Sequence, residues 1–347
     1  MSENTDTFSA QRLEEIAIRI FRAMGTPADT AELVSHSLIL SNLVGHDSHG
    51  IIRIVEYYGW VKNSDLNPKA LPTITWSKAS SAFVDGAWGF GQPAATLAMN
   101  EVIRLAKNTG TASVVIGRNN HVGRLGEYVN EIANQGMLGM SFCNAAATIV
   151  APYGGVKPLM GTNPFAWAIP GSGEMNTVLD FSTAVIAAGR VIQAAMSGET
   201  IQAGALIDKY GKPSTNPQDL IEGGALLPFG EHKGSGLSVL IDVAAGALSG
   251  VLPAAIENTG HGNGTVIIAM DISNYVELNI FKSIAQAFSV ALHSTKSELG
   301  PEVLMPGEFE FQNKKQRERM GIYLGKGVQE NIRKVATELG VDIPEFH

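Results

Sequence analysis

The feature of this sequence that most restricts its fold is a change in hydrophobic spacing near Leu71. Over residues 7–62, apolar residues recur every three or four positions, as they do along amphipathic helices. Beyond Leu71, short runs rich in β-branched and aromatic residues alternate with helical stretches. The runs lie at 113–116, 138–142, 165–169 and 265–268, and the helical stretches at 94–107, 125–135, 184–196 and 236–248. This alternation predicts an α/β fold with a central sheet flanked by helices.

Both ends of the chain are expected to be helical. Three helices are predicted between residues 7 and 67, and one more at 329–339, after a charged segment that follows Pro306. A length of 347 residues also suggests about two domains. We therefore expect a helical subdomain made of residues 1–75 joined by 306–347, and a sheet domain over residues 76–305.

Composition excludes some classes of protein. Hydrophobic residues make up 45% of the chain and charged ones 17%, against about 25% charged in an average soluble protein. This apolar content excludes intrinsic disorder, and the low charge indicates a surface covered by a second subunit, so we expect a homodimer or larger assembly. A net charge of -8 without a basic run argues against nucleic acid as a partner.

The longest apolar tract, residues 237–256, contains Asp242, two glycines and a proline. A membrane span needs about 20 apolar residues, so this tract predicts a buried or interface helix and no membrane partner. It also leaves open a non-enzymatic helical interaction protein that docks through this tract. Cys143 is the single cysteine, which excludes a disulfide framework. Residues 1–11 lack the apolar segment of a signal peptide, so a cytoplasmic location is expected.

Two glycine-rich motifs resemble nucleotide-binding loops without matching them. Gly89-Phe-Gly91 precedes a helix, but the acidic residue that a dinucleotide fingerprint needs about 20 residues later is missing. Residues 230–236 place Lys233 before a glycine, whereas a P-loop needs Gly-Lys-Ser/Thr. We therefore predict neither a Rossmann fold nor a P-loop, although Lys233 at a helix start can still hold a phosphate.

His46 and His49 lie three positions apart with Asp47 between them, so a metal site has to be weighed. Zinc and iron sites usually need a third protein ligand, and no partner motif such as H-E-x-x-H occurs elsewhere. A metal-dependent hydrolase centred on His46 and His49 stays as an alternative, and the site prediction contains no metal.

The same segment also suggests an organic acid site. On one helix, His49 and Arg53 would lie about one turn apart. A histidine can protonate a carbonyl oxygen, and an arginine can bind a carboxylate through two parallel hydrogen bonds. Together they predict a site for a 2-oxo or 2-hydroxy acid. The alternative is that Arg53 is an exposed helix residue paired with Glu56 or Glu32.

Three further polar clusters follow predicted strands. They are Asn119-Asn120-His121-Val122-Gly123, Gly161-Thr162-Asn163-Pro164 and Leu179-Asp180-Phe181-Ser182-Thr183. Loop residues at such places often carry function. Asp180 ends a strand, where an acid can accept from ribose hydroxyls, and the alternative role for it is a helix N-cap.

Seven motifs, taken together and in their order along the chain, resemble the type 2 malate/L-lactate dehydrogenase family. They are S-H-G-x-x-R, N-N-H-x-G, A-P-Y-G-G, G-T-N-P, D-F-S-T, L-P-F-G-x-H-K-G and M-P-G-E. That family includes sulfolactate and ureidoglycolate dehydrogenases, diketogulonate reductase and a cyclic imine reductase. The match covers residues 46–340. The resemblance implies a non-Rossmann, mixed and largely antiparallel sheet that binds NAD or NADP, so residues 76–305 would form the cofactor-binding domain.

The resemblance also implies roles for individual residues. His49 matches the proton donor, with Ser48 beside it, and His121 matches a histidine that serves either as acid/base or in the cofactor pocket. On the substrate side the matches are Arg53 and Thr162. The residues implied near the cofactor are His121, Asp180, Phe181, Ser182, His232, Lys233, Gly307 and Glu308. Arg190 stands where the imine reductase branch has an aspartate, which disfavours that activity and would suit a substrate with an extra anionic group.

The sequence therefore predicts an NAD(P)-dependent dehydrogenase of small 2-hydroxy acids. A hydride would pass between the nicotinamide and C2 of the substrate, while His49 or His121 moves the hydroxyl proton. The identity of the hydroxy acid, the choice between NAD and NADP, and the choice of histidine stay open at this point.

Overall fold

The computed structural model describes residues 7–145, 147–256, 262–295 and 302–343. Within these ranges the main sheet has seven strands in the order β2-β3-β4-β11-β5-β6-β7. Their bounds are β2 Thr73–Ser77, β3 Ser81–Asp85, β4 Thr111–Gly117, β5 Met137–Ala145, β6 Phe165–Ile169, β7 Thr177–Phe181 and β11 Asn263–Asp271. All neighbouring strands are antiparallel except β3 and β4, which are parallel. The expectation of a mixed, largely antiparallel, non-Rossmann sheet is confirmed.

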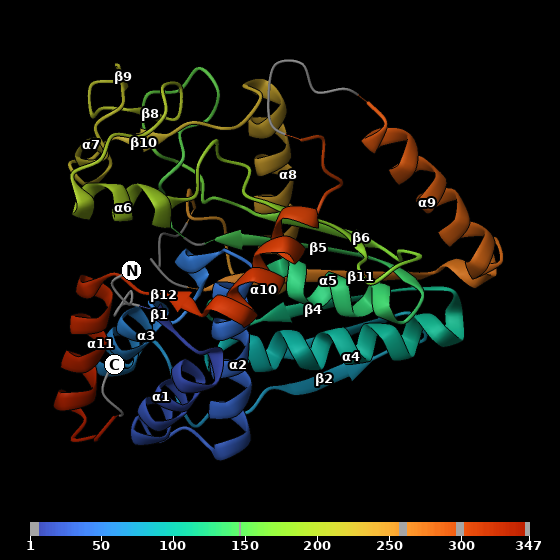
Figure 1. Ribbon diagram of the computed structural model, residues 1–347, viewed down its shortest axis with the longest axis horizontal. Helices are drawn as coiled ribbons and strands as arrows, with labels where there is room; N and C mark the ends of the chain where they lie inside the picture. Colours follow the sequence, from blue (N-terminus) through green and yellow to red (C-terminus); the bar gives the residue numbers. More distant parts are fainter. Residues whose placement is uncertain (1–6, 146, 257–261, 296–301, 344–347) are drawn as a thin grey trace.

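Helices cover both faces of this sheet (Figure 1). On one face lie α4 (Gly91–Thr109) and α5 (Leu125–Asn134), whose apolar residues pack against alternate strand residues such as Val84, Val114 and Ile116. On the other face lies α8 (His232–Ser249), which packs against β5 and β11. Strand residues alternate in direction, so each face of the sheet is buried by its own helices.

A helical bundle stands beside the sheet and holds a separate core. It contains α1 (Ala10–Ala23), α2 (Ala28–Leu43), α3 (Arg53–Lys62) and α11 (Lys326–Glu338), with β1 (Thr7–Phe8) paired to β12 (Ile322–Tyr323). The helix α10 (Glu308–Met320) contacts α2. N- and C-terminal segments therefore pack together here (Figure 1). The division into 1–75 with 306–347 and into 76–305 stays a prediction.

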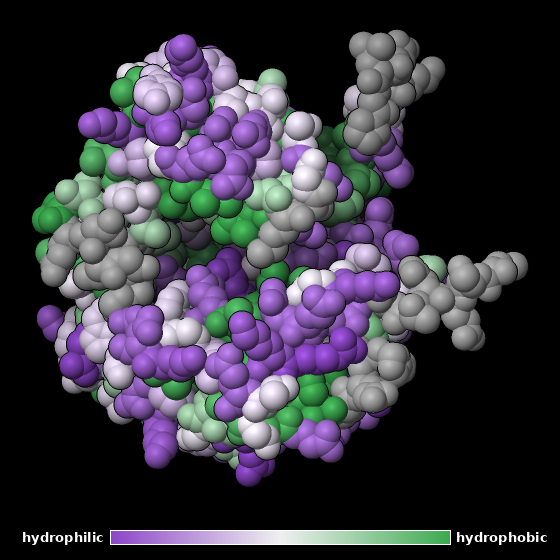
Figure 2. Space-filling view, turned by 90° about the vertical axis from the view of Figure 1, so that its left-hand side faces the viewer, coloured by the Kyte–Doolittle hydropathy of each residue, from purple (hydrophilic) through white to green (hydrophobic). Residues whose placement is uncertain are grey.

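The remaining elements lie at two edges of the molecule. A three-stranded sheet of β8 (Leu206–Ile207), β9 (Pro213–Ser214) and β10 (Ala225–Leu226) packs near α6 (Ala188–Ser197) and α7 (Gln218–Ile221). At the opposite edge, the turn η2 (Ile272–Asn274) leads into α9 (Leu278–His293), which has no buried residue. The side of the molecule that carries α6 and α11 is hollowed between them (Figure 2).

The helix expected after Ser48 begins later than predicted. Asp47–His49 forms a 3-10 turn, η1, and Gly50 is extended at φ -87 and ψ -156, so α3 starts only at Arg53. The reason is Asn42, whose Oδ1 accepts a hydrogen bond from the Ile51 N–H at 2.8 Å. Asn42 packs so closely that a Cβ at position 50 would lie 2.2 Å from this oxygen. The placement of His49 and Arg53 on one helix was therefore wrong.

The apolar tract at 237–256 forms most of α8. Its outward face exposes Val239, Leu240, Val243 and Leu248, and Leu252 and Ile256 continue it. Across the described ranges, none of the helices is both long and apolar enough to cross a bilayer.

Candidate active site

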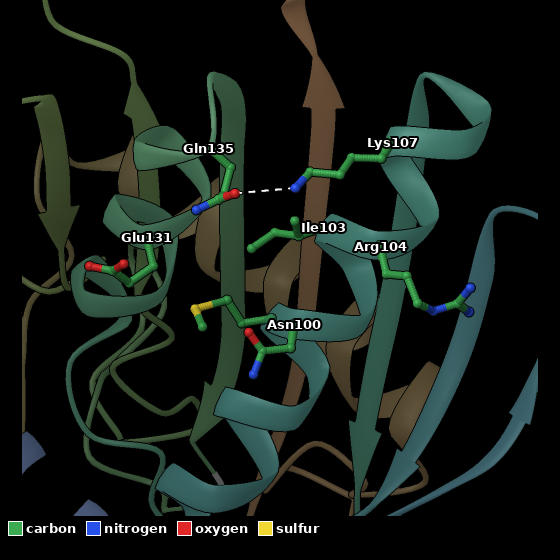
Figure 3. A pocket seen from close by; sticks show the side chains of 7 residues that line it. Asn100, Ile103, Arg104, Lys107, Glu131 and Gln135 are labelled. Carbon is green, nitrogen blue, oxygen red and sulfur yellow. Dashed lines mark hydrogen bonds between the residues drawn. The ribbon is translucent and has the colours of Figure 1, made fainter.

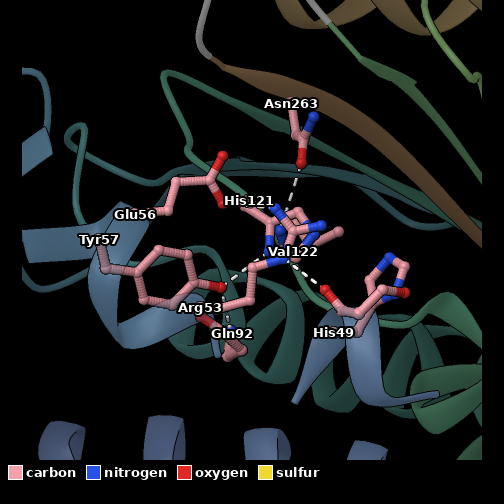
Figure 4. A network of polar contacts seen from close by, with 9 residues as sticks. His49, Arg53, Glu56, Tyr57, Gln92, His121, Val122 and Asn263 are labelled. Atoms are coloured by element: carbon pink, nitrogen blue, oxygen red, sulfur yellow. Dashed lines mark hydrogen bonds and ion pairs between the residues drawn. The ribbon is translucent and has the colours of Figure 1, made fainter. Parts of the chain in front are cut away.

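Two loops bring His49 and His121 together, although each comes from a different part of the fold. His49 ends the turn after α2, and His121 lies in the loop between β4 and α5. Their rings stack with centroids 5.4 Å apart and an interplanar angle of 29°. Figure 4 shows both beside Arg53 and Tyr57. The site thus joins the helical bundle to the sheet.

The glycine motif at Gly89 and Gly91 lets the His121 loop pass close to α4. A Cβ at Gly91 would lie 2.2 Å from the carbonyl oxygen of His121. Asn120 ties the same loop down, since its Nδ2 donates to the carbonyl oxygens of Trp88 at 3.0 Å and Gly89 at 3.1 Å. The glycine at 91 is therefore explained by close backbone packing.

The hydrogen bonds around His121 favour one position for its ring proton. Gln92 Nε2 donates to the Tyr57 hydroxyl at 2.9 Å, which leaves the proton of this hydroxyl available for His121 Nδ1, 2.7 Å away. Nδ1 is then an acceptor, and the neutral ring carries its proton on Nε2. Desolvation, followed by the charges of Arg53 and His49, holds the pKa of His121 well below 6.5. His121 is therefore a neutral hydrogen-bond donor at neutral pH.

His49 has a different partner. Its Nδ1 lies 3.1 Å from the Ser48 hydroxyl, which can donate to it or accept from it. Desolvation is the largest cause that lowers the pKa of His49, followed by the charges of Arg53, His46 and Arg124. The start of α6 covers Ser48, because a Cβ at Gly189 would lie 2.6 Å from the Ser48 Cβ. Because the Ser48 hydroxyl can both donate and accept, it can keep its hydrogen bond to His49 when the protonation of that ring changes.

Arg53 stands beside the histidine pair and is 22% exposed at its side chain. Its Nε donates to the Ser48 carbonyl oxygen at 2.6 Å, and its Nη1 pairs with Glu56. The structure therefore brings Arg53 next to Ser48 and His49. The structure also contains the ion pair between Arg53 and Glu56 that the alternative interpretation of Arg53 as a helix surface residue predicts.

The helix α10 holds the turn that carries His49. Arg317 binds Asp47 through two nitrogens at 2.7 and 3.0 Å. His46 Nε2 lies 3.1 Å from Glu310 Oε1, so the His46 side chain contacts α10. Within the described ranges, no group of three or more His, Cys, Asp or Glu side chains could hold a metal ion.

The segment after β7 gathers other residues named by the sequence. Ser182 Oγ and Thr183 Oγ1 both donate to the Thr162 carbonyl oxygen, at 3.1 and 2.9 Å. Phe181 packs edge-on against Phe229. Thr162 and Ser182 are therefore neighbours, as a shared pocket would require.

Asp180 does not cap the helix that follows it in sequence. It lies within β7, and its Oδ2 accepts from the Gly126 N–H at 2.7 Å, in the first turn of α5. Arg124 Nη1 approaches the same oxygen to 3.9 Å. The carboxylate thus faces the loop that carries His121 and not α6.

The last four residues named by the sequence lie at two helix starts. His232 and Lys233 are exposed in the first turn of α8, with the His232 ring edge-on to Tyr153. Gly307 has φ +91, and a Cβ there would lie 3.1 Å from the backbone nitrogen and oxygen of Val178 in β7. Glu308 Oε2 accepts from the Met305 N–H at 2.8 Å and lies 2.9 Å from His293 Nε2. The structure does not bring these residues into direct contact with the histidine pair.

Sequence reasoning missed Tyr57, Gln92 and Arg124. Tyr57 follows Arg53 by four positions on α3, a spacing that could have indicated a shared face. Arg124 follows His121 by three positions in the same loop. Gln92 offered no such signal, because its contact with Tyr57 joins residues 35 positions apart.

A second hollow lies between α4 and α5 (Figure 3). It is lined by Met99, Asn100, Ile103, Arg104, Lys107, Glu131 and Gln135. Lys107 Nζ donates to Gln135 Oε1 at 3.2 Å across it. Its lining is the outward surface of two helices, and it contains neither histidine nor cysteine.

Comparison with known proteins gives one consistent result. The family model of malate/L-lactate dehydrogenases matches residues 8–333. The malate/(S)-sulfolactate dehydrogenase of Methanothermus fervidus is 33% identical over 96% of this chain and 98% of its own length. Hydroxycarboxylate dehydrogenase B of Escherichia coli is 32% identical over 98% and 96%. The solved structure of sulfolactate dehydrogenase from Methanocaldococcus jannaschii superimposes with a TM-score of 0.88 at 30% identity, covering 97% of this chain and 98% of that one.

Proposed function

The chain belongs to the malate/L-lactate dehydrogenase family, and on that premise we propose that it transfers a hydride between NAD(P) and a small 2-hydroxy or 2-oxo acid. The observation that carries this proposal is the stacked pair of His49 and His121 beside Arg53. It supplies two imidazoles for the reacting oxygen and a guanidinium for the neighbouring carboxylate.

The residues near β7 fit a dinucleotide. Asp180 offers a carboxylate, Thr162 and Ser182 offer hydroxyls, and Lys233 offers an exposed cation at the start of α8. These are the acceptor, donor and phosphate-binding groups that such a cofactor needs. When bound, the nicotinamide supplies or accepts the hydride at C2 of the substrate. We propose NAD as the cofactor, with NADP as the alternative.

We assign the proton transfer to His49. With Nδ1 of His121 accepting from Tyr57, a second proton on this ring would cost that hydrogen bond. His121 is suited to donate a hydrogen bond to the substrate oxygen while remaining neutral. His49 has only the adaptable Ser48 hydroxyl at Nδ1. During oxidation the neutral ring, which its lowered pKa maintains, takes the hydroxyl proton of the substrate. During reduction the ring first takes up a proton, which the negative charge of a bound carboxylate favours, and then gives it to the oxygen of C2.

Two further proposals concern the assembly and its compartment. The outward face of α8 exposes Leu240 at 70% and Val243 at 55%, and α9 exposes Ile284 at 65% and Phe288 at 63%. Apolar area of this kind is commonly covered by a subunit, so we propose a homodimer. We also propose a cytoplasmic location, which a chain with a single cysteine and therefore no disulfide framework favours.

The experiment is a panel of 2-oxo acids with NADH and with NADPH, followed by cofactor absorbance. Oxidation of one cofactor that depends on a 2-oxo acid and is unaffected by a chelator is the expected result. His49→Asn should lower turnover by about 10²–10⁴-fold, the usual range for a positioned acid or base, and leave NADH binding intact. No activity with any 2-oxo acid would refute the function. Near-normal turnover of His49→Asn, with loss in His121→Asn, would reverse the two roles.

A further inference from the structure

Two chain segments meet at the carboxyl ends of β3 and β4, beside the loop that carries His121. These strands are the parallel pair of the sheet, and in open α/β sheets ligands commonly bind outside such ends. Six non-glycine residues in the described ranges have a positive φ, a region that side chains rarely adopt. Three of the six lie at this one place: Ala87 at +50°, Trp88 at +55° and Arg118 at +46°. Backbone strain of this kind persists only where surrounding contacts enforce it, and it gathers at functional sites.

An ion pair fastens the two strained segments to each other. Arg118 Nε and Nη2 bind the two carboxylate oxygens of Asp85 at 3.0 and 2.7 Å. Asp85 Oδ1 also accepts from the Ala87 N–H at 2.8 Å, so one carboxylate holds both segments. Burial opposes the ionisation of Asp85, but the bonds from Arg118 and Ala87 keep its pKa below the ordinary value. The pair therefore stays charged at neutral pH.

Backbone contacts join the same two segments. The Trp88 N–H donates to the Arg118 carbonyl oxygen at 2.7 Å. A Cβ at Gly86 would lie 2.9 Å from that oxygen, so the two segments touch without room for a side chain. The Trp88 carbonyl oxygen in turn accepts from Asn120 Nδ2 at 3.0 Å. A displacement of the turn at 86–89 would therefore move Asn120 and His121, which follows it.

His121 depends on such contacts because it lies in a loop and not in a helix or strand. On the C-terminal side of His121, Asn263 Oδ1 accepts from the Val122 N–H at 3.3 Å (Figure 4). On its N-terminal side, the ion pair of Asp85 and Arg118 closes the turn. The placement matters, since a shift of about 1 Å at a reacting group can lower a rate by about 10²-fold.

We propose that Asp85 and Arg118 are positioning residues for His121, because their ion pair enforces the strained turn at 86–89 and so places the histidine for the reacting oxygen. This inference rests on the proposed function, in which His121 donates a hydrogen bond to that oxygen. The alternative is an ordinary surface ion pair, since the Arg118 side chain is 59% exposed. Such a pair contributes little to stability and would leave turnover unchanged.

The first test removes the ion pair and asks which kinetic constant changes. In Arg118→Met, kcat should fall about 5- to 30-fold, as a small displacement of His121 requires. KM for the 2-oxo acid and the Kd of NADH should stay within about twofold, because the pair acts on the reacting oxygen only. Asp85→Asn should give the same result. Arg104→Met is the matched control with wild-type kcat, since the Arg104 side chain is 57% exposed and binds Glu101 through two nitrogens on α4.

The second test relieves the strain itself. Glycine adopts a positive φ without steric cost, so Ala87→Gly should keep or raise the midpoint of unfolding in urea. It should nevertheless lower kcat by about twofold or more, because the relaxed turn no longer holds His121 in one place. Ser64→Gly is the control, since Ser64 has φ +65° in an exposed turn after α3. This control should keep or raise the midpoint as well, with wild-type kcat.

Several results would overturn the inference while leaving the dehydrogenase proposal intact. They are a wild-type kcat in both Arg118→Met and Asp85→Asn, an equal fall of kcat in Arg104→Met, and a rise in KM or in the Kd of NADH without a fall in kcat. Ala87→Gly with wild-type kcat or with a lowered midpoint would do the same. If Arg118→Met does not fold, Asp85→Asn and Ala87→Gly decide by these criteria. Absence of wild-type activity on every 2-oxo acid would instead refute the proposed function.

Discussion

Replacement of Tyr57 by Phe tests the assignment of His121 as a neutral donor. The change removes a hydroxyl that donates to His121 Nδ1 at 2.7 Å and accepts from Gln92 Nε2 at 2.9 Å. Each such hydrogen bond contributes about 0.5–1.5 kcal/mol, so unfolding should become easier by about 1–3 kcal/mol. Without the Tyr57 donor, the preference for the proton on Nε2 weakens by the same 0.5–1.5 kcal/mol per bond, or about 2- to 13-fold.

Two measurements follow these effects. We expect kcat to fall by a factor in that range, and the pKa of His121 to rise, because the bond from Tyr57 favours the neutral ring. The acidic limb of the kcat/KM profile should therefore move to higher pH. Tyr58→Phe is the matched control, since the Tyr58 hydroxyl donates to Glu338 at the surface. Nitrogen NMR of wild-type His121 with the proton on Nδ1 would refute the reasoning, as would identical pH profiles for the Tyr57→Phe and wild-type enzymes.

Three other expectations can be checked together. Arg317→Met loses both hydrogen bonds to Asp47, which hold the turn that carries His49. It should lower kcat about 5- to 10-fold without changing the Kd of NADH. An equal loss of kcat in Arg319→Met, on the same helix, would contradict this. Folding lowers the pKa of His49 below 6.5, so the unfolded chain takes up the proton first and the unfolding free energy falls as pH drops below 6.5. In urea titrations at several pH values, His49→Asn should reduce the slope of the unfolding free energy against pH by up to about 1.4 kcal/mol per pH unit. An unchanged slope would contradict a lowered pKa of His49 in the folded protein. Sedimentation at micromolar concentration should give a dimer mass, and a monomer would remove that proposal.

Local patterns predicted the elements of the sheet well. The strand expected at 165–169 is β6, and the run at 113–116 is the middle of β4. The absence of an acidic residue after the Gly89-Phe-Gly91 motif correctly excluded a Rossmann sheet. These features depend on spacing within about ten residues, where periodicity reports burial directly.

Contacts between residues far apart in the sequence could not be predicted from such local patterns. The bend at Gly50 depends on Asn42, and the turn before it depends on Arg317, which is 270 positions from Asp47. The partner of Asp180 is a backbone N–H 54 positions away, whereas its place at the end of a strand suggested a ribose-binding acid or, as the alternative, a helix cap. Hydrogen bonds of this kind are set by tertiary packing, and a sequence pattern reveals them only where both partners belong to one recognisable motif.

The account depends most directly on Arg53 as the residue that binds the substrate carboxylate. Lysine keeps the charge of Arg53 but cannot form two parallel hydrogen bonds. Arg53→Lys should therefore lower kcat/KM for 2-oxo acids about 10- to 150-fold, as loss of a charged hydrogen bond of 1.5–3 kcal/mol requires. The Kd of NADH, followed by tryptophan fluorescence, should stay nearly unchanged. Glu56→Gln, which removes only the ion-pair partner of Arg53, separates this role from a structural one. Arg53→Lys with wild-type kinetics on every 2-oxo acid would contradict a carboxylate substrate at this site.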